Sequence, residues 1–170
     1  MLSRRHFATA GLTGIVATTL AFFTRSGSQN ASAAGAGTFE ITKPDEEWRK
    51  LLTPAQYNVL RQHGTERAGT SPLDKEYGRG VYSCAGCDLP LFAASTKFNS
   101  GTGWPSFYAP LENAVATTTD RSFFMARTEV HCRRCGGHLG HVFDDGPKPT
   151  GLRYCMNGVA LKFNPEKQAS

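Results

Sequence analysis

Apolar residues recur at helical spacing in two segments between residues 44 and 64 of this 170-residue chain. The first segment begins at Pro44, which acidic residues follow, and Trp48 contributes to its apolar face. The second begins at Thr53 with the sequence Thr-Pro-Ala-Gln, a capping box with proline at the first helical position. Gly64 is a typical C-terminal stop. Two short helices are therefore predicted ahead of Gly64.

After Gly64 the pattern changes to short runs of β-forming residues, which Gly, Pro, Asn and Asp separate. No segment of helical length and periodicity follows. The runs predict strands at residues 80–83, 89–92, 115–119, 122–127, 139–143 and 159–163. The chain is therefore expected to be mainly β, with two small, twisted antiparallel sheets packed against two or three short N-terminal helices.

The first 33 residues indicate an export signal. Arg4 and Arg5 form a twin-arginine start, an apolar run follows over residues 8–23, and Ala-Ser-Ala at 31–33 fits a small-residue cleavage site. The alternative is an uncleaved membrane anchor, but this run of about 16 residues is shorter than the roughly 20 that a spanning helix needs. We therefore expect cleavage near Ala33, export by the twin-arginine (Tat) translocase and a periplasmic location.

Removing the leader leaves 137 of the 170 residues, the size of one ordinary domain. Residues 34–43 are rich in Ala, Gly and Thr and are expected to form a flexible linker, residues 44–164 the domain, and residues 165–170 a C-terminal tail. The leader carries three arginines and no acidic residue, so its removal lowers the net charge from +5 to +2. A charge this small gives no reason to expect a nucleic acid as partner.

Four of the five cysteines form two Cys-x-x-Cys pairs, Cys84 with Cys87 and Cys132 with Cys135. Two such pairs can present four thiolates to one tetrahedral zinc ion and leave no open position for catalysis, so a structural zinc is predicted. The 44 residues between the pairs exceed the spacing of a self-contained zinc ribbon, so the ion would join two distant hairpins. The alternatives are two disulfides or one redox-active pair.

The fifth cysteine, Cys155, then has no partner left in the sequence and is a candidate nucleophile. His138 and His141 precede it, and an imidazolium near Cys155 would lower the pKa of the thiol and could deliver a proton. Residues three apart point to opposite faces of a regular strand, so the backbone must bend if both histidines serve one site. Neighbouring glycines permit that bend. The alternatives for the two histidines are a purely structural role and a metal site.

A further candidate is Trp104, within Gly-Thr-Gly-Trp-Pro-Ser-Phe at residues 101–107. Glycines on either side of a tryptophan can hold its aromatic face in the open, where it binds methyl and thioether groups. The alternative is that Trp104 belongs to the core.

Together these motifs resemble those of the B-type peptide-methionine (R)-S-oxide reductases. The resemblance covers roughly residues 44–164 and rests on Gly-Trp-Pro-Ser-Phe, His-Leu-Gly-His-Val-Phe-Asp-Asp-Gly-Pro, Arg-Tyr-Cys-Met-Asn and the two Cys-x-x-Cys pairs. It implies a β-rich fold with a structural zinc and reduction of the R epimer of methionine sulfoxide, peptide-bound or free. It assigns Cys155 as nucleophile, Asn157 and the two histidines to the polar site, and Trp104 and Phe107 to substrate binding.

One position departs from this pattern. Many members of the family carry a second, resolving cysteine where this chain has Thr102. With four cysteines committed to zinc, a sulfenic acid formed on Cys155 would have to be reduced by an external thiol, either a thioredoxin-like protein or a small thiol. The expected role is repair of oxidised exported proteins that carry methionine-R-sulfoxide, and the alternatives are a zinc-ribbon binding module or a thiol peroxidase.

Overall fold

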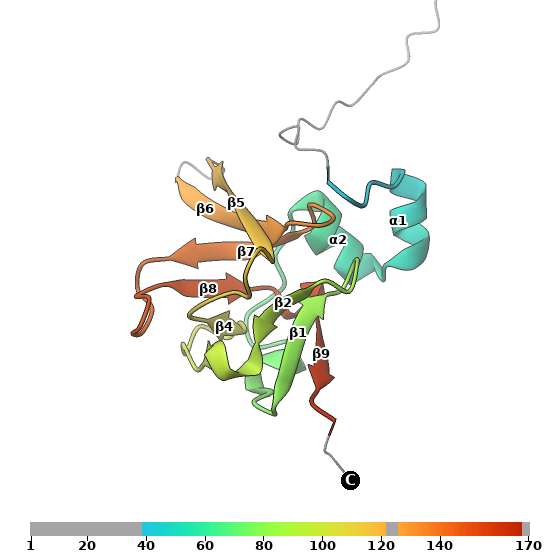
Figure 1. Cartoon of the computed structure of the whole chain (residues 1–170). Coiled ribbons are helices and arrows are strands. Elements are labelled where there is room, and N and C mark those ends of the chain that lie inside the picture. The colour runs from blue at the N-terminus through green and yellow to red at the C-terminus, as the bar shows by residue number, and fades with distance from the viewer. Residues whose placement is uncertain (1–38, 122–125, 168–170) are drawn as a thin grey trace, which may run out of the picture. The chain divides into compact units, whose positions relative to one another are not determined.

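The computed structural model describes residues 39–121 and 126–167 (Figure 1). The predicted leader lies outside these ranges, so the export signal and its cleavage stay predictions. Within the described ranges, no helix is both long enough and apolar enough to cross a membrane.

Both predicted helices are confirmed. Helix α1 spans Asp45–Leu51 and helix α2 spans Pro54–Gln62. The capping box of α2 is formed in both directions, because the Thr53 hydroxyl accepts from the backbone N–H of Gln56 while the Gln56 side chain accepts from that of Thr53. The helix ends at His63, which adopts a left-handed conformation with φ 55°.

The strands form two antiparallel sheets, which confirms the predicted mainly β fold. The smaller sheet has the order β2-β1-β9, and the larger has the order β3-β4-β8-β7-β6-β5. The smaller sheet consists of β1 (Gly80–Cys84), β2 (Pro90–Ala93) and β9 (Leu161–Pro165). The larger consists of β3 (Lys97–Phe98), β4 (Ser106–Phe107), β5 (Val115–Asp120), β6 (Arg127–Cys132), β7 (His138–Phe143) and β8 (Arg153–Met156).

Four of the six predicted strands agree with β1, β2, β5 and β7. The run at 122–127 meets β6 only at Arg127, and its residues 122–125 lie outside the described ranges. The last strand starts two residues later than predicted because a 3-10 turn, Gly158–Ala160, precedes it, and it ends at Pro165. Strands β3, β4 and β8 escaped prediction because two to four residues are too few to show an alternating pattern.

Aromatic rings pack the two sheets together. Phe92 of the smaller sheet stacks on Phe107 of the larger, with ring centroids 4.4 Å apart. Tyr82 meets the same ring edge-on at 4.9 Å. All three side chains are fully buried. Phe107 therefore lies in the core. The resemblance implied that it binds substrate, whereas its ring is fully buried.

Candidate active site and metal centre

The site is built on the pairing of β7 with β8, two central strands of the larger sheet (Figure 1). His141 stands directly opposite Cys155 in the register, so the two side chains project from the same face of the sheet. A side chain at Gly140 would collide with the carbonyl oxygen of Cys155. Glycine at this position is what lets β7 approach the strand that carries the thiol.

A β-bulge in β7 brings the second histidine to the same place. Val130 pairs with Gly140 while the next residue, His131, pairs with His138, so β7 has one more residue than β6 between these pairs. The extra residue reverses the face on which His138 would otherwise lie. The rings of His138 and His141 meet edge-on with centroids 5.4 Å apart, as the predicted bend requires.

Cys155 opens into a pocket of about 130 Å³ that combines aromatic and polar walls. The rings of Trp104 and Phe143 supply the aromatic part, and His141 and Arg127 supply the polar part. The complete lining comprises Thr65, Trp104, Arg127, Gly140, His141, Phe143, Cys155 and Asn157. Four of these eight residues, namely Trp104, His141, Cys155 and Asn157, were expected from the sequence. The pocket can enclose a small group that is apolar on one side and polar on the other.

The Cys155 thiol is half-buried beneath hydroxyl groups and a guanidinium. The Thr102 hydroxyl lies 4.0 Å from its sulfur, so the loop position at which the sequence resemblance implied a resolving cysteine does lie beside Cys155. Burial raises the pKa of this thiol, while Thr102, Arg153 and Ser106 act in the opposite direction. The sequence led us to expect an imidazolium in that role. Arg153 was missed, although it stands only two positions before Cys155.

The guanidinium of Arg153 is held in place by two neighbours. It forms a bidentate ion pair with Asp145, both N–O distances being 2.8 Å. Its central carbon also lies 4.5 Å from the centre of the Phe143 ring. These contacts fix a positive charge beside Cys155, and the carboxylate of Asp145 partly offsets that charge.

On the polar side of the pocket, His141 and Arg127 both contact the carboxylate of Asp120. His141 Nε2 lies 2.8 Å from Asp120 Oδ2, and the same oxygen accepts from Arg127 Nη2 at 2.7 Å. Burial lowers the pKa of His141, and the hydrogen bond to Asp120 opposes that shift. Burial thus favours the neutral form of His141, while Asp120 fixes the orientation of its ring.

Asn157 lines the pocket, and its side-chain hydrogen bonds also help to hold the pocket's shape. Its side-chain oxygen accepts from the Glu66 N–H at 3.0 Å, and its amide donates to the Leu139 carbonyl at 3.0 Å. The Glu66 carbonyl in turn accepts from Trp104 Nε1 at 3.1 Å. Asn157 and Glu66 therefore fix Trp104 against the strand that carries Cys155.

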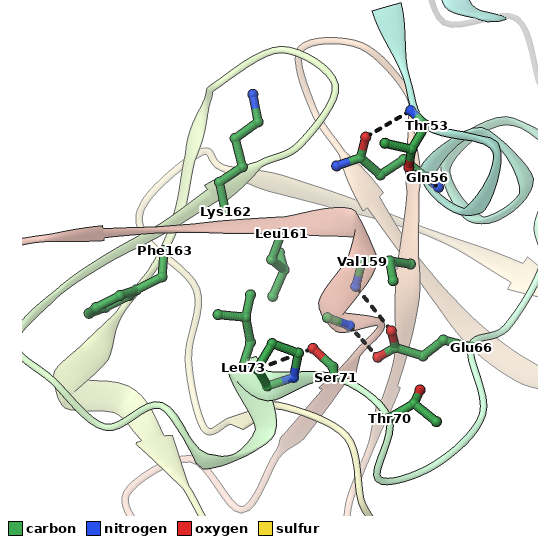
Figure 2. A pocket seen from close by; sticks show the side chains of 12 residues that line it. Thr53, Gln56, Glu66, Thr70, Ser71, Leu73, Val159, Leu161, Lys162 and Phe163 are labelled. Atoms are coloured by element: carbon green, nitrogen blue, oxygen red, sulfur yellow. Dashed lines mark hydrogen bonds between the residues drawn. The ribbon is translucent and has the colours of Figure 1, made fainter.

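The Glu66 side chain binds the backbone that directly follows Asn157 (Figure 2). Its carboxylate accepts from the backbone N–H groups of Gly158 and Val159, the latter at 3.1 Å. It forms one wall of a second, more open pocket of about 370 Å³, which lies between the start of α2, the 70–73 segment and β9. Neither Cys155 nor the two predicted histidines line this second pocket.

Four sulfur atoms converge at a separate place, where β1 and β6 end. The Cys84 and Cys135 sulfurs are 3.8 Å apart, the Cys87 and Cys132 sulfurs 3.5 Å apart, and all four lie within 4.8 Å of one another. A tetrahedron with Zn–S bonds of about 2.3 Å has sulfurs roughly 3.8 Å apart, whereas a disulfide has about 2.05 Å. The four cysteines can therefore bind one metal ion, and their spacing is not that of disulfides.

The turns that carry the four thiols are well defined. In each, the backbone N–H four residues on returns to the first cysteine's carbonyl: Asp88 to Cys84 at 2.9 Å and Gly136 to Cys132 at 2.8 Å. Gly136 has φ +67°, a conformation that favours glycine. As predicted from the spacing, the cluster joins two hairpins from different sheets.

A single thiol in a partly aromatic pocket, separate from a four-cysteine cluster that can bind a metal ion, is an arrangement suited to thiol chemistry on a small group. The chain belongs to the SelR domain family, whose model matches residues 52–165.

Its relatives include proteins named peptide methionine sulfoxide reductase MsrB. The protein from Leptospira interrogans is 55% identical over 129 residues, covering 75% of this chain and 98% of the relative. The protein from Pseudomonas putida is 56% identical over 131 residues, covering 76% and 98%, and that from Agrobacterium fabrum is 53% identical over 127 residues, covering 74% and 94%. The predicted class, a B-type methionine sulfoxide reductase and hence a peptide-methionine (R)-S-oxide reductase, is confirmed.

The raised pKa of Cys155 can be tested by alkylation. Because burial disfavours the thiolate, labelling by iodoacetamide should reach half its maximal rate at a pH above that of an ordinary cysteine, about 8.5. Thr102→Val removes a hydroxyl that stabilises the thiolate, so it should raise the pKa further and slow labelling at pH 8. The measurement is the labelling rate of the Cys155 peptide by mass spectrometry across pH. Thr117→Val, an exposed threonine on β5, is the control. A midpoint below 8 would contradict this description of the thiol.

Proposed function

We propose that this protein reduces methionine-R-sulfoxide, in peptides or free, with Cys155 as nucleophile and an external thiol as reductant. The observation that carries the proposal is the juxtaposition of one thiol with two aromatic rings, Trp104 and Phe143, and a hydrogen-bonded histidine, His141. The substrate's methyl group fits the aromatic wall, through dispersion and sulfur–aromatic contact. Its sulfoxide oxygen fits the polar wall.

The first step transfers oxygen from methionine to cysteine. The Cys155 thiolate supplies two electrons to the substrate, the sulfur–oxygen bond of the sulfoxide breaks, and a new sulfur–oxygen bond forms on Cys155. A sulfoxide is a poor electrophile until its oxygen takes up a proton, so the site must provide thiolate and proton together. The products are methionine and a sulfenic acid on Cys155.

His141 is our choice of proton donor over His138. It lines the pocket directly opposite Cys155, whereas His138 is buried behind it and does not line the pocket. The pKa of His141 is lowered and that of the Cys155 thiol is raised, so the resting site favours the neutral forms of both. Transfer of the Cys155 thiol proton to His141 would then supply both the thiolate and the imidazolium that the reaction needs.

The second half of the cycle needs thiols from outside the protein. One external thiol attacks the sulfenic acid, water leaves, and a mixed disulfide forms; a second thiol releases Cys155 and leaves as the reductant's disulfide. Thr102 occupies the position from which a resolving cysteine would act, and it contributes only a hydroxyl. A thioredoxin-like protein or a small thiol is the proposed donor.

We further infer that the four-cysteine centre holds a structural zinc ion. Cys84, Cys87, Cys132 and Cys135 would supply four thiolates, the ligand set that zinc prefers in closed structural sites. Bound there, the ion contributes folding free energy rather than chemistry, since no coordination position is left open.

The leader sequence supports a proposal about location. The twin-arginine start, the short apolar run and the Ala-Ser-Ala site favour export by the Tat translocase and a periplasmic protein. Tat substrates cross the membrane folded, which is compatible with a domain that acquires its metal before export. The substrates would then be exported proteins whose methionines have been oxidised.

The activity is tested with separated epimers. The protein should convert methionine-R-sulfoxide to methionine with dithiothreitol and leave the S epimer unchanged, measured by chromatography of the free amino acid. Cys155→Ser should lower the rate at least about 10³-fold without loss of the metal or the fold, because the nucleophile is gone. Equal turnover of both epimers, or of neither, would refute the proposal. Consumption of peroxide without sulfoxide turnover would indicate a thiol peroxidase instead.

The metal is tested by composition and stability. One zinc per chain should copurify, and Cys132→Ser should lower the melting temperature by at least about 10 °C or abolish cooperative unfolding, because structural zinc contributes several kcal/mol. Cys155→Ser serves as the matched control and should keep both the zinc and the melting temperature. Elemental analysis without metal, together with disulfides in the native mass spectrum, would contradict the assignment.

A further inference from the structure

A second group of ionisable residues lies behind the pocket, where β6, β7 and the end of α2 meet. The Glu129 carboxylate is at its centre. Its Oε1 lies 2.7 Å from His138 Nδ1 and 3.0 Å from His63 Nδ1, and its Oε2 accepts from the Thr118 hydroxyl at 2.8 Å. Both carboxylate oxygens are therefore committed, which fixes the orientation of Glu129.

Three imidazole rings run in series from the surface to the pocket. His63 is 56% exposed, His138 is 3% exposed, and His141 lines the pocket. The centroids of the His63 and His138 rings are 5.2 Å apart, and those of His138 and His141 are 5.4 Å apart. The series connects solvent, through Glu129 and His138, to the histidine opposite Cys155.

Glu129 determines how His138 presents itself to His141. The three hydrogen bonds keep Glu129 ionised, with its pKa far below the usual range despite burial. An ionised carboxylate only accepts, so the proton on His138 must sit on Nδ1. His138 is thereby held in one tautomer and one orientation against the edge of His141. The bulge in β7 places the ring at that contact.

His63 is the outer end of the same arrangement. The hydrogen bond to Glu129 raises the pKa of His63. It is the C-cap residue of α2, and its ring, although half-exposed, is held at Glu129 by the 3.0 Å contact. Other charged or titratable groups also face the cluster: Arg61 from α2, Asp120 from β5, Arg127 and His131 from β6, and His141 from β7.

We propose that Glu129 is a positioning residue for the reduction, that it fixes the tautomer and orientation of His138 against His141, and that His63 holds Glu129 from the solvent side. The inference rests on the proposed function, since it concerns how His141, the proposed proton donor of that reaction, is oriented. Neither Glu129 nor His63 lines the pocket, so each acts through another side chain.

Opposite charges give the two residues opposite effects on the pH profile. Glu129→Gln removes the anion that favours an imidazolium, so the limb on which activity falls with rising pH should move to lower pH. His63→Gln keeps an amide donor but removes an imidazole whose pKa the hydrogen bond to Glu129 raises, so the same limb should move to higher pH. If the two substitutions only damaged the structure, this limb would stay in place in both variants or would move in the same direction in both.

The experiment is the pH dependence of kcat and KM for methionine-R-sulfoxide with dithiothreitol, in the full chain. Glu129→Gln should lower kcat between about 10- and 100-fold, the range found when the partner that orients an imidazole is removed, and leave KM within about twofold. His63→Gln should lower kcat less than about threefold. Glu129→Asp, which keeps the charge, should restore part of the loss. Glu112→Gln, an exposed carboxylate ahead of β5, should behave as wild type.

The results separate this inference from the proposed function. Normal wild-type turnover with an unchanged kcat and pH profile in Glu129→Gln would overturn the inference alone. Shifts of both variants in the same direction would do the same. If Glu129→Gln fails to fold, His63→Gln decides the question by the direction of its shift, because His63 is exposed. Absence of turnover in the wild-type protein would overturn the proposed function and this inference with it.

Discussion

Four cysteine sulfurs converge at the point where the two sheets end, and the rest of the domain is arranged around that point. Cys84 closes β1 of the smaller sheet and Cys132 closes β6 of the larger, so the cluster ties together strands from different sheets. A metal ion bound by these four cysteines would close a long loop, and its binding free energy would contribute to folding. Helix α2 is attached to the same point, since Arg61 donates to the Cys135 carbonyl at 3.0 Å.

The proposed chemistry depends on strand β7, which follows the Cys132–Cys135 turn. After the Cys132–Cys135 turn, the chain enters β7 with a bulge and then with Gly140, and these two features decide where the histidines lie. The bulge brings His138 and His141 to one face, and the glycine admits β8 close enough to set Cys155 opposite His141. The four-cysteine cluster and the Cys155 thiol are therefore separate sites. Strand β7 links them, because it follows the Cys132–Cys135 turn and pairs with β8.

Much of this could be predicted from sequence because local signals are strong. The capping box at Thr53, the pairing of the four cysteines and the isolation of Cys155 each depend on residue type and spacing alone. Arg153, Asp145 and Phe143 could not be found in this way. Their roles come from a bidentate ion pair and a ring contact across a turn between strands, which leave no periodic trace in the sequence. Phe107 shows the converse case, a residue in a distinctive motif that packs in the core.

We propose that the five cysteines divide into one that reacts and four that hold the fold. The most direct test of this division is the state of Cys155 after one turnover without reductant. One equivalent of methionine-R-sulfoxide should leave a sulfenic acid on Cys155, detected by mass spectrometry as one added oxygen that dimedone traps. Cys84, Cys87, Cys132 and Cys135 should remain unmodified and metal-bound. An intramolecular disulfide between Cys155 and any of these four would contradict the division.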